Sequence, residues 1–179
     1  MKYFRLLTPY DSQDARLGVS LGLCVSVLSE WPFYFPSNLH HYYANFNAST
    51  TFKNQAMLQG IEPDDCFYIQ NEADVRGKDR LDLTIDPPPD LALEIDITSR
   101  THSNIYEALG VPELWRFEKG ELQINILQPD GKYARRECSS IFPDLPLIEN
   151  LPKYVQTSKS IGRNKTMKLF RQWVREFRM

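Results

Sequence analysis

The sequence predicts an α/β domain with a central mixed β-sheet flanked by α-helices. Its 179 residues suffice for one globular domain with a sizeable core. From Ser49 onward, segments with the two-residue alternation of β-strands are separated by turns and by one short helical segment. The last part of the chain has the periodicity of an amphipathic helix. We therefore expect three parts, which are an N-terminal segment over residues 1–48, a core over 49–150 and a basic amphipathic helix over 151–179.

One apolar stretch in the first part, Leu17–Leu28, has the hydropathy of a secretion-signal core but is too short to span a bilayer. The residues before it include Asp11 and Asp14, and no small-x-small cleavage site follows it. These features favour a buried helix or strand over a signal. The three cysteines are scattered and form no CxxC pair, which indicates reduced thiols. We expect a cytoplasmic protein without a membrane segment.

The first strands of the core are predicted over Ser49–Phe52, from its β-branched content, and over residues 62–69, from their alternation. In the second segment, Asp64, Cys66 and Tyr68 fall on one face, and Asp65, Phe67 and Ile69 fall on the other. A polar loop is expected over residues 70–86. Three prolines at 87–89 then give a stiff entry to the next strand.

Residues 90–98 have the clearest alternation, with leucines and isoleucines at the odd positions and Asp90, Ala92, Glu94, Asp96 and Thr98 at the even ones. A short helix is predicted over residues 104–109, ended by Gly110. Two further strands are predicted over Glu113–Phe117 and Leu122–Leu127, joined by a turn at Lys119-Gly120. Another turn is expected over residues 128–132.

The C-terminal helix is predicted to be apolar on one side and basic on the other. Residues 153–179 carry eight basic residues and one acidic residue, and their net charge of +7 leaves −9 for residues 1–152. The basic side contains Lys165, Lys168, Arg171, Arg175 and Arg178, and the apolar side contains Met167, Phe170, Trp173, Val174 and Phe177. Such a helix is ordinarily docked on a core with its charged side in solvent, and the basic side is also compatible with contacts to a phosphate backbone.

Glu94 and Asp96 are the residues whose pattern points to chemistry. Residues two apart in a strand share a face and lie roughly 6–7 Å apart. Buried carboxylates require a cation or hydrogen-bond donors, and hard oxygen ligands suit Mg²⁺ or Mn²⁺, which can activate a water against a phosphodiester. The alternative is a sheet face that is merely solvated. The alternation by itself does not decide between the two.

A series of uncommon strings extends the argument beyond two carboxylates. In order along the chain they are Thr50–Lys53, Gly60–Asn71, Arg76–Arg80, Asp86–Thr98, Tyr106–Arg116 and Phe142–Pro146. This series, over residues 49–147, resembles the cyanobacterial type of Uma2 domain, a branch of the PD-(D/E)XK nuclease superfamily. The resemblance implies a restriction-endonuclease-like core, a metal-dependent endonuclease activity that hydrolyses DNA phosphodiester bonds, Mg²⁺ (or Mn²⁺) as cofactor, and DNA as partner.

The resemblance also implies roles for single residues. Asp64 matches the first metal-binding aspartate, and Glu94 matches the acidic residue of the (D/E)XK element. Asp96 stands where the superfamily lysine would be and would assist the metal or its water. Lys53 is the candidate for a replacement lysine that steadies the charge developing on phosphate. The expected metal ligands are thus Asp64, Glu94 and Asp96, and these with Lys53 are the expected catalytic residues.

Departures from the family keep a second function open. The lysine is absent at position 96, and residues 1–48 lack the strand with a glutamate and a Ser-Pro pair that relatives carry. Ser99–Asn104 is short, and its His102 is a candidate for proton transfer or a bystander. The alternative is a catalytically degenerate, nucleic-acid-associated or oligomeric protein that retains the fold. A third alternative is a purely structural remnant. A homodimer is implied only by the resemblance.

Overall fold

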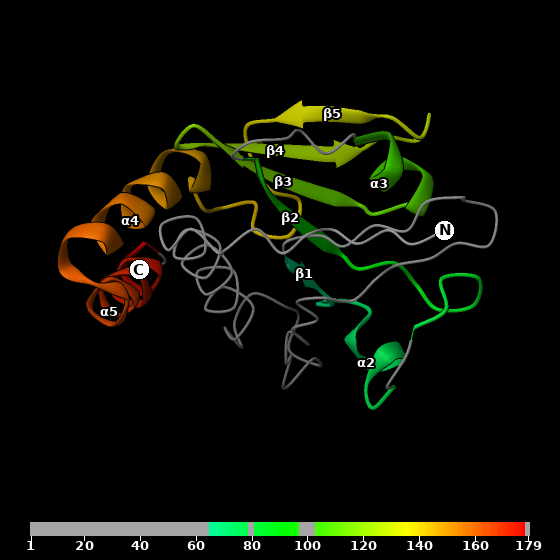
Figure 1. Ribbon diagram of the computed structural model, residues 1–179, viewed down its shortest axis with the longest axis horizontal. Helices are drawn as coiled ribbons and strands as arrows, with labels where there is room; N and C mark the ends of the chain where they lie inside the picture. The colour runs from blue at the N-terminus through cyan, green and yellow to red at the C-terminus, as the bar shows by residue number, and fades with distance from the viewer. Residues whose placement is uncertain (1–64, 79–80, 97–102, 178–179) are drawn as a thin grey trace, which may run out of the picture.

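The computed structural model describes residues 65–78, 81–96 and 103–177 of the chain (Figure 1). The strands are β1 (Asp65–Phe67), β2 (Leu91–Asp96), β3 (Glu113–Glu118), β4 (Glu121–Leu127) and β5 (Tyr133–Arg136). The helices are α2 (Glu72–Val75), α3 (Ser103–Leu109), α4 (Leu147–Ile161) and α5 (Arg163–Glu176).

The five described strands form one mixed sheet in the order β1-β2-β3-β4-β5. β2 and β3 are parallel, and the other neighbours are antiparallel. A parallel pair requires a crossover connection, and α3 lies in the connection between β2 and β3. The predicted α/β fold, a mixed sheet with flanking helices, is confirmed.

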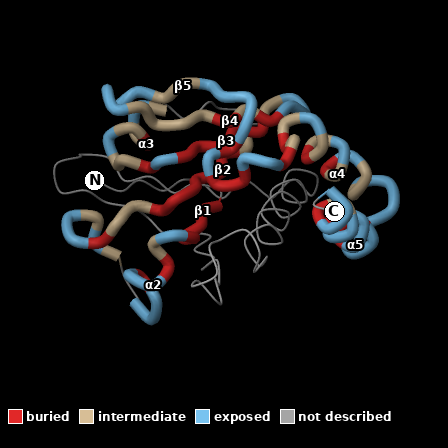
Figure 2. Tube along the Cα trace, turned by 180° about the vertical axis from the view of Figure 1, so that it is seen from behind, coloured by how far each residue is buried: buried red, intermediate tan, exposed pale blue. Residues whose placement is uncertain are grey.

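The sheet has a buried core on each face. The α5-side core is built from Phe67, Ile69, Leu91, Leu93, Trp115, Phe117, Leu122, Ile124, Ile141, Phe142, Leu145, Leu147, Leu151, Val155, Met167, Phe170 and Val174. The α3-side core is built from Cys66, Tyr68, Val75, Ala92, Tyr106, Val111 and Leu114. Figure 2 shows that the buried residues concentrate along β1, β2 and β3, whereas β5 is largely exposed or half-buried. The central strands are therefore covered on both faces.

The predicted alternation of the first described strand is confirmed. Cys66 and Tyr68 belong to the α3-side core, and Phe67 and Ile69 belong to the α5-side core. β1 itself is shorter than the predicted segment, because pairing with β2 extends only from Asp65 to Phe67 among the described residues. The predicted strand at Ser49–Phe52 and the apolar stretch Leu17–Leu28 lie outside the described residues.

The predictions for the middle of the chain are confirmed within one or two residues. α3 ends before Gly110, whose φ of 74° is the left-handed conformation that glycine adopts at a helix end. The turn between β3 and β4 has φ 52° at Lys119 and 87° at Gly120. Two successive positive φ values are those of a type I′ hairpin turn, which matches the twist of the strands.

Two described elements, α2 and β5, were not predicted, nor was the first turn of α4, which begins at Leu147. α2 interrupts the segment expected to be a loop over residues 70–86. Residues 151–179 were predicted as one helix, but the structure has two helices there, because Gly162 separates α4 from α5 with a φ of 83°. Among the described residues, no helix is both long enough and apolar enough to cross a membrane.

Candidate active site

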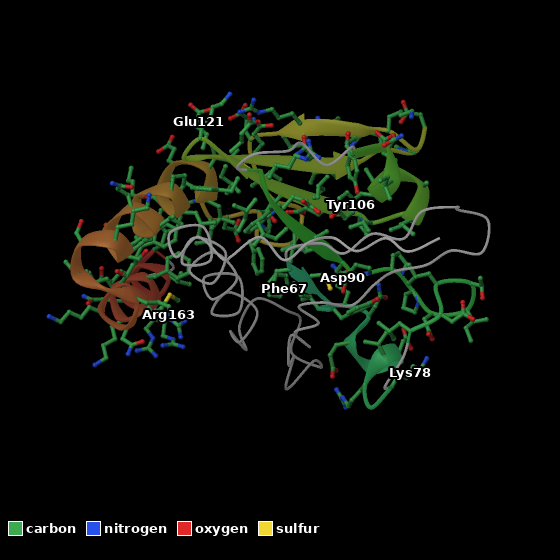
Figure 3. All side chains as sticks on the ribbon, in the orientation of Figure 1. Phe67, Lys78, Asp90, Tyr106, Glu121 and Arg163 are labelled. Carbon is green, nitrogen blue, oxygen red and sulfur yellow. The ribbon has the colours of Figure 1, made fainter. Side chains whose placement is uncertain are left out.

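Glu94 is a buried carboxylate in the middle of β2. It is 4% exposed, and it lies on the α3-side face, because Ala92 two residues earlier belongs to the α3-side core. The hydroxyl of Tyr106 in α3 donates a hydrogen bond to Oε1 of Glu94. Tyr106 is itself 1% exposed and is labelled in Figure 3. The crossover between β2 and β3 therefore places a tyrosine hydroxyl directly on the carboxylate.

Two more polar side chains continue from Glu94 across the sheet. Arg116 of β3 is the register partner of Glu94, and Gln123 of β4 is the register partner of Arg116. Register partners share a face, and neighbouring strands lie about 4.8 Å apart. We call Glu94, Arg116 and Gln123 the polar row. Arg116 is 6% exposed, so a buried basic residue and the buried acidic Glu94 occupy paired positions of neighbouring strands, an arrangement in which opposite charges can compensate each other.

Three acidic positions follow the polar row at the end of the sheet. Asp96 pairs with Glu118, and Glu118 pairs with Glu121. The backbone of Asp96 closes β2, while its side chain lies outside the described part of the structure. Glu118 is half-buried, and its Oε1 is 3.3 Å from Nζ of Lys119. The end of the sheet at which β2 and β3 finish is therefore acidic.

Of the predicted site residues, Glu94 is fully described and Asp96 is described in its backbone only. Lys53, Asp64 and His102 lie outside the described residues. The structure brings Glu94 together with Tyr106 and Arg116, to which the sequence analysis gave no role. No local signal identified Arg116, because a charge between Trp115 and Phe117 in a predicted strand fits a solvated face as well as a buried one.

The buried carboxylates around the connection between β1 and β2 have structural roles. Oδ2 of Asp90 accepts hydrogen bonds from the backbone N–H groups of Ile69, Gln70 and Asn71 at 2.6, 2.8 and 3.1 Å. The Asn71 side chain donates to Oδ1 at 2.9 Å. Burial raises the pKa of Asp90, and the backbone donors oppose that rise. Asp90 thus fixes the chain where it leaves β1 (Figure 3).

The loop after α2 is held by two ion pairs. Arg76 pairs with the buried Glu72, and Lys78 pairs with the buried Asp86. The hydrogen bond from Lys78, together with that from the backbone N–H of Asp82, holds the pKa of Asp86 below its usual value. The two basic residues come from the string Arg76–Arg80, so this string has a structural role in the fold.

Glu113 is a further buried carboxylate, on the opposite face of the sheet from Glu94. It is 0% exposed and lies two residues before Trp115 in β3. Nε1 of Trp115 donates to its Oε1 at 2.5 Å, and the backbone N–H of Ser140 donates to Oε2 at 2.8 Å. The Ser140 hydroxyl donates to the same oxygen. These donors satisfy the carboxylate within the α5-side core and tie β3 to the segment before α4.

Comparison with known protein families identifies the domain. The chain matches the model of the family described as "Uma2: Putative restriction endonuclease" over residues 18–155, which is more than half of its length. The chain belongs to the Uma2 family. No curated protein matches it. The match begins within residues 1–48, and the boundaries drawn at residues 48 and 150 stay predictions.

Membership of the Uma2 family agrees with the mixed sheet and flanking helices, which are those of a restriction-endonuclease-like α/β fold. A nuclease family also suggests the use of a metal. Among the residues that the structure describes, no group of three or more His, Cys, Asp or Glu side chains is placed to hold one. Glu94 fits in chemical type, since carboxylate oxygens are the ligands of Mg²⁺ and Mn²⁺.

Proposed function

We propose that this Uma2 domain is a metal-dependent endonuclease that hydrolyses phosphodiester bonds in DNA. The observation that carries the proposal is Glu94, a carboxylate that is 4% exposed in the centre of a restriction-endonuclease-like sheet. Burial of an acid is costly unless a cation or donors compensate it, and such sites are typical of catalysis. Family membership supplies the class of reaction, and Glu94 supplies a candidate place for it.

The pairing of β1 with β2 supports a role for Asp64 beside Glu94. Asp65 pairs with Leu93, the residue before Glu94, and Cys66 pairs with Ala92. Asp64 is joined to Asp65 by one peptide bond, so its Cα is about 3.8 Å from that of Asp65. The even-numbered residues of β1 and β2 have their side chains on the α3-side face. If the strand alternation continues back from Cys66, the side chain of Asp64 is on the same face as that of Glu94. This assignment is part of the proposal, because Asp64 lies outside the described residues.

The proposed roles follow from the chemistry of each side chain. Asp64, Glu94 and Asp96 hold Mg²⁺ or Mn²⁺, which when bound polarises the phosphodiester and lowers the pKa of a water. Tyr106 donates to one oxygen of Glu94 and thereby fixes the orientation of the carboxylate. Arg116 balances the negative charge in the polar row. Lys53 stabilises the charge that develops on the phosphate.

The test is plasmid nicking in Mg²⁺ or Mn²⁺, comparing wild type with Glu94→Gln. The glutamine keeps the size of the side chain and an oxygen that accepts from Tyr106, but it removes the charge that a metal requires. We expect nicking to fall by about 100-fold or more, since even residues that only support metal ligands cost 10–100-fold when mutated. Glu149→Gln is the matched control, because Glu149 is an exposed glutamate of α4, outside the candidate site.

One observation favours a second candidate, a non-catalytic nucleic-acid-associated protein with the same fold. Glu94 already accepts a hydrogen bond from Tyr106 and lies beside Arg116, so its burial is compensated in part by the protein itself. Wild type that is folded, binds DNA and nicks no plasmid in either metal would establish this candidate in place of the nuclease. Nicking that survives Glu94→Gln would instead remove Glu94 from the site.

A further inference from the structure

We propose that the outer side of α5 is a surface that binds the phosphate backbone of duplex DNA. The surface, which we call the basic face, consists of Lys165, Lys168, Arg171 and Arg175, all of them exposed. The inference rests on the proposed function, which names DNA as the substrate. It adds the place at which the domain holds that polymer, which lies outside the polar row.

The four cations lie on one side of the helix. With 3.6 residues per turn, the basic face covers roughly a third of the circumference of α5, and from Lys165 to Arg175 it extends about 15 Å along the axis. Successive cations are separated by about 4.5–6 Å along the axis. One strand of B-DNA carries a phosphate about every 3.4 Å of its axis. A row of cations at this spacing can contact several phosphates of one strand.

The opposite side of α5 is buried, and this decides between nucleic acid and a lipid surface. Met167, Phe170 and Val174 are 6%, 0% and 0% exposed in the α5-side core. The ring of Phe170 packs edge-on against Tyr154 of α4, with centroids 5.1 Å apart. A basic amphipathic helix binds a bilayer by inserting its apolar side, and in α5 the residues Met167, Phe170 and Val174 of that side are already packed in the core, while Phe177 at its end is 49% exposed. The partner that remains for the basic face is a polyanion recognised by charge.

The charge distribution along α5 also favours an anion. Its first turn contains no acidic residue, although acids are the favourable residues there, and Arg163 and Lys165 occupy that end instead. The positive end of the helix dipole adds to these cations. The one acid of the helix, Glu176, is at the other end and accepts from the Gln172 side chain at 2.7 Å. Basic residues therefore outnumber acidic ones along α5, and the acid lies at its C-terminal end.

The position of α5 suits a contact outside the polar row. Figure 1 shows α4 and α5 beside the end of the sheet at which β2 and β3 finish and β4 begins. Figure 3 shows side-chain nitrogen atoms gathered around α5, near the labelled Arg163. Asp96 closes β2 at this same end. The basic face and Asp96 are thus at the same end of the sheet, and a contact to phosphates there requires no contact to base edges.

The test measures DNA binding by the full-length protein in EDTA, so that cleavage does not enter the result. Fluorescence anisotropy with two short duplexes of unrelated sequence is followed as salt rises from about 50 to 200 mM. The variant Lys168→Gln/Arg175→Gln removes two of the four charges of the basic face. The control Arg135→Gln/Arg136→Gln removes two exposed charges of β5. Circular dichroism verifies that both variants are folded.

We expect wild type and control to bind both duplexes equally and with the same salt dependence. For the basic-face variant we expect affinity about tenfold lower at low salt, with the slope of log K against log salt smaller by about 1.8, since each lost phosphate contact removes about 0.9. Equal binding by the variant and the control would overturn the inference, as would binding of wild type to anionic vesicles but not to DNA. Either result leaves plasmid nicking by wild type as an independent measure of the proposed activity.

Discussion

Glu94 and Glu113 are two buried glutamates on opposite faces of the same sheet, and their surroundings differ. Glu113 accepts hydrogen bonds from Trp115 and from the backbone and hydroxyl of Ser140, inside an otherwise apolar core. Glu94 accepts from a tyrosine hydroxyl and lies beside Arg116 in the polar row. Glu113 is therefore a structural link between β3 and the segment before α4, whereas Glu94 belongs to a row of polar residues from three strands.

The bond from Tyr106 to Glu94 gives a prediction at the scale of single residues. Tyr106→Phe removes only the hydroxyl, and we expect the free energy of unfolding to fall by about 1.5–3 kcal/mol, the usual range for a hydrogen bond to a charged group. In the Glu94→Gln background the same substitution should cost about 1 kcal/mol less, because the acceptor is then neutral. Urea unfolding of the four proteins in this double-mutant cycle measures the difference.

A coupling near zero would contradict this assignment, because it would mean that the tyrosine stabilises the fold through packing alone. The cycle also bears on function. A Tyr106→Phe protein that is folded but nicks plasmid more slowly would identify Tyr106 as a positioning residue for Glu94. Its activity should not be restored by changing the metal from Mg²⁺ to Mn²⁺, since the lost group orients a carboxylate and does not select the ion.

At the residue scale, sequence alone located Glu94 because strand alternation is local. The run of apolar odd positions from Leu91 to Ile95 shows which residues face the other way. The contact with Tyr106 spans twelve residues and depends on how α3 returns to the sheet, so no local pattern contains it. The same holds for Ser140, which reaches Glu113 across twenty-seven residues. Residue type and face were predictable here, and tertiary partners were not.

At the scale of elements, α3 is tied to β5 through Glu107. Lys132 donates to its Oε2 at 2.9 Å, and the backbone N–H of Tyr133 donates to its Oε1 at 3.2 Å. The Tyr133 hydroxyl donates to the carbonyl of Val111 at 2.7 Å, just after the helix. The hydrogen bond from Lys132 is the largest cause that holds the pKa of Glu107 below its usual value. The edge strand and the crossover helix therefore stabilise each other through one carboxylate.

This pKa shift predicts a pH dependence. Because the folded-state pKa of Glu107 lies below its unfolded value of 4.5, its ionised form contributes stability above pH 4.5. That contribution is lost as pH falls from about 4.5 through the folded-state pKa. We expect Glu107→Gln to be less stable than wild type at pH 7 and to lose less stability on acidification. Thermal unfolding at a series of pH values from 7 to about 3 measures both effects.

The matched control for this series is Glu149→Gln, which changes an exposed glutamate of α4 and should leave the acid dependence of wild type unchanged. If Glu107→Gln had the same unfolding temperature as wild type at every pH, the link between α3 and β5 would not stabilise the fold. Asp86 has a lowered pKa as well, through Lys78, and its contribution remains in both proteins. The difference between the two curves therefore reports on Glu107.

Elements with a strong local period were predictable from sequence, and those without one were not. β2, β3, β4 and α3 follow alternation or turn signals such as Lys119-Gly120. β5 consists of Tyr-Ala-Arg-Arg, which has no apolar alternation, and it forms because β4 supplies the pairing. α4 begins at Leu147, ahead of the helix predicted from residue 151, and it contains Pro152, which cannot donate a hydrogen bond within the helix. Burial of Leu147, Leu151 and Val155 outweighs that loss.

At the scale of the whole molecule, the sheet is shared by two cores, and the α4–α5 pair closes one of them. Tyr154, Phe170 and Trp173 form an aromatic cluster between the two helices, with centroid separations of 5.1–5.7 Å. Side chains of both helices belong to the same buried cluster as Leu91 and Trp115 of the sheet. Since the cluster is continuous, we infer that the helix pair unfolds together with the sheet and not before it.

Two neighbouring residues of α5 test this inference. Phe170 is 0% exposed in the α5-side core, whereas Leu169 is 45% exposed on the same helix. We expect Phe170→Ala to lower the free energy of unfolding by about 3–5 kcal/mol and Leu169→Ala by less than about 1 kcal/mol. Denaturant unfolding is followed by far-ultraviolet circular dichroism and by tryptophan fluorescence, in a Trp31→Phe/Trp173→Phe background that leaves Trp115 as the one tryptophan of the chain. One cooperative unit requires that both signals of each variant give the same midpoint.

Separate midpoints would contradict a shared core. If the helix pair were an independent unit, Phe170→Ala would shift the circular-dichroism loss of α4 and α5 to low denaturant, while the buried Trp115 would report unchanged unfolding of the sheet. Coincident shifts would mean that the basic face of α5 is rigidly attached to the sheet that carries Glu94. That attachment is what a surface holding DNA at a fixed position relative to the polar row requires, because small displacements of a substrate from its reacting groups reduce the rate severely.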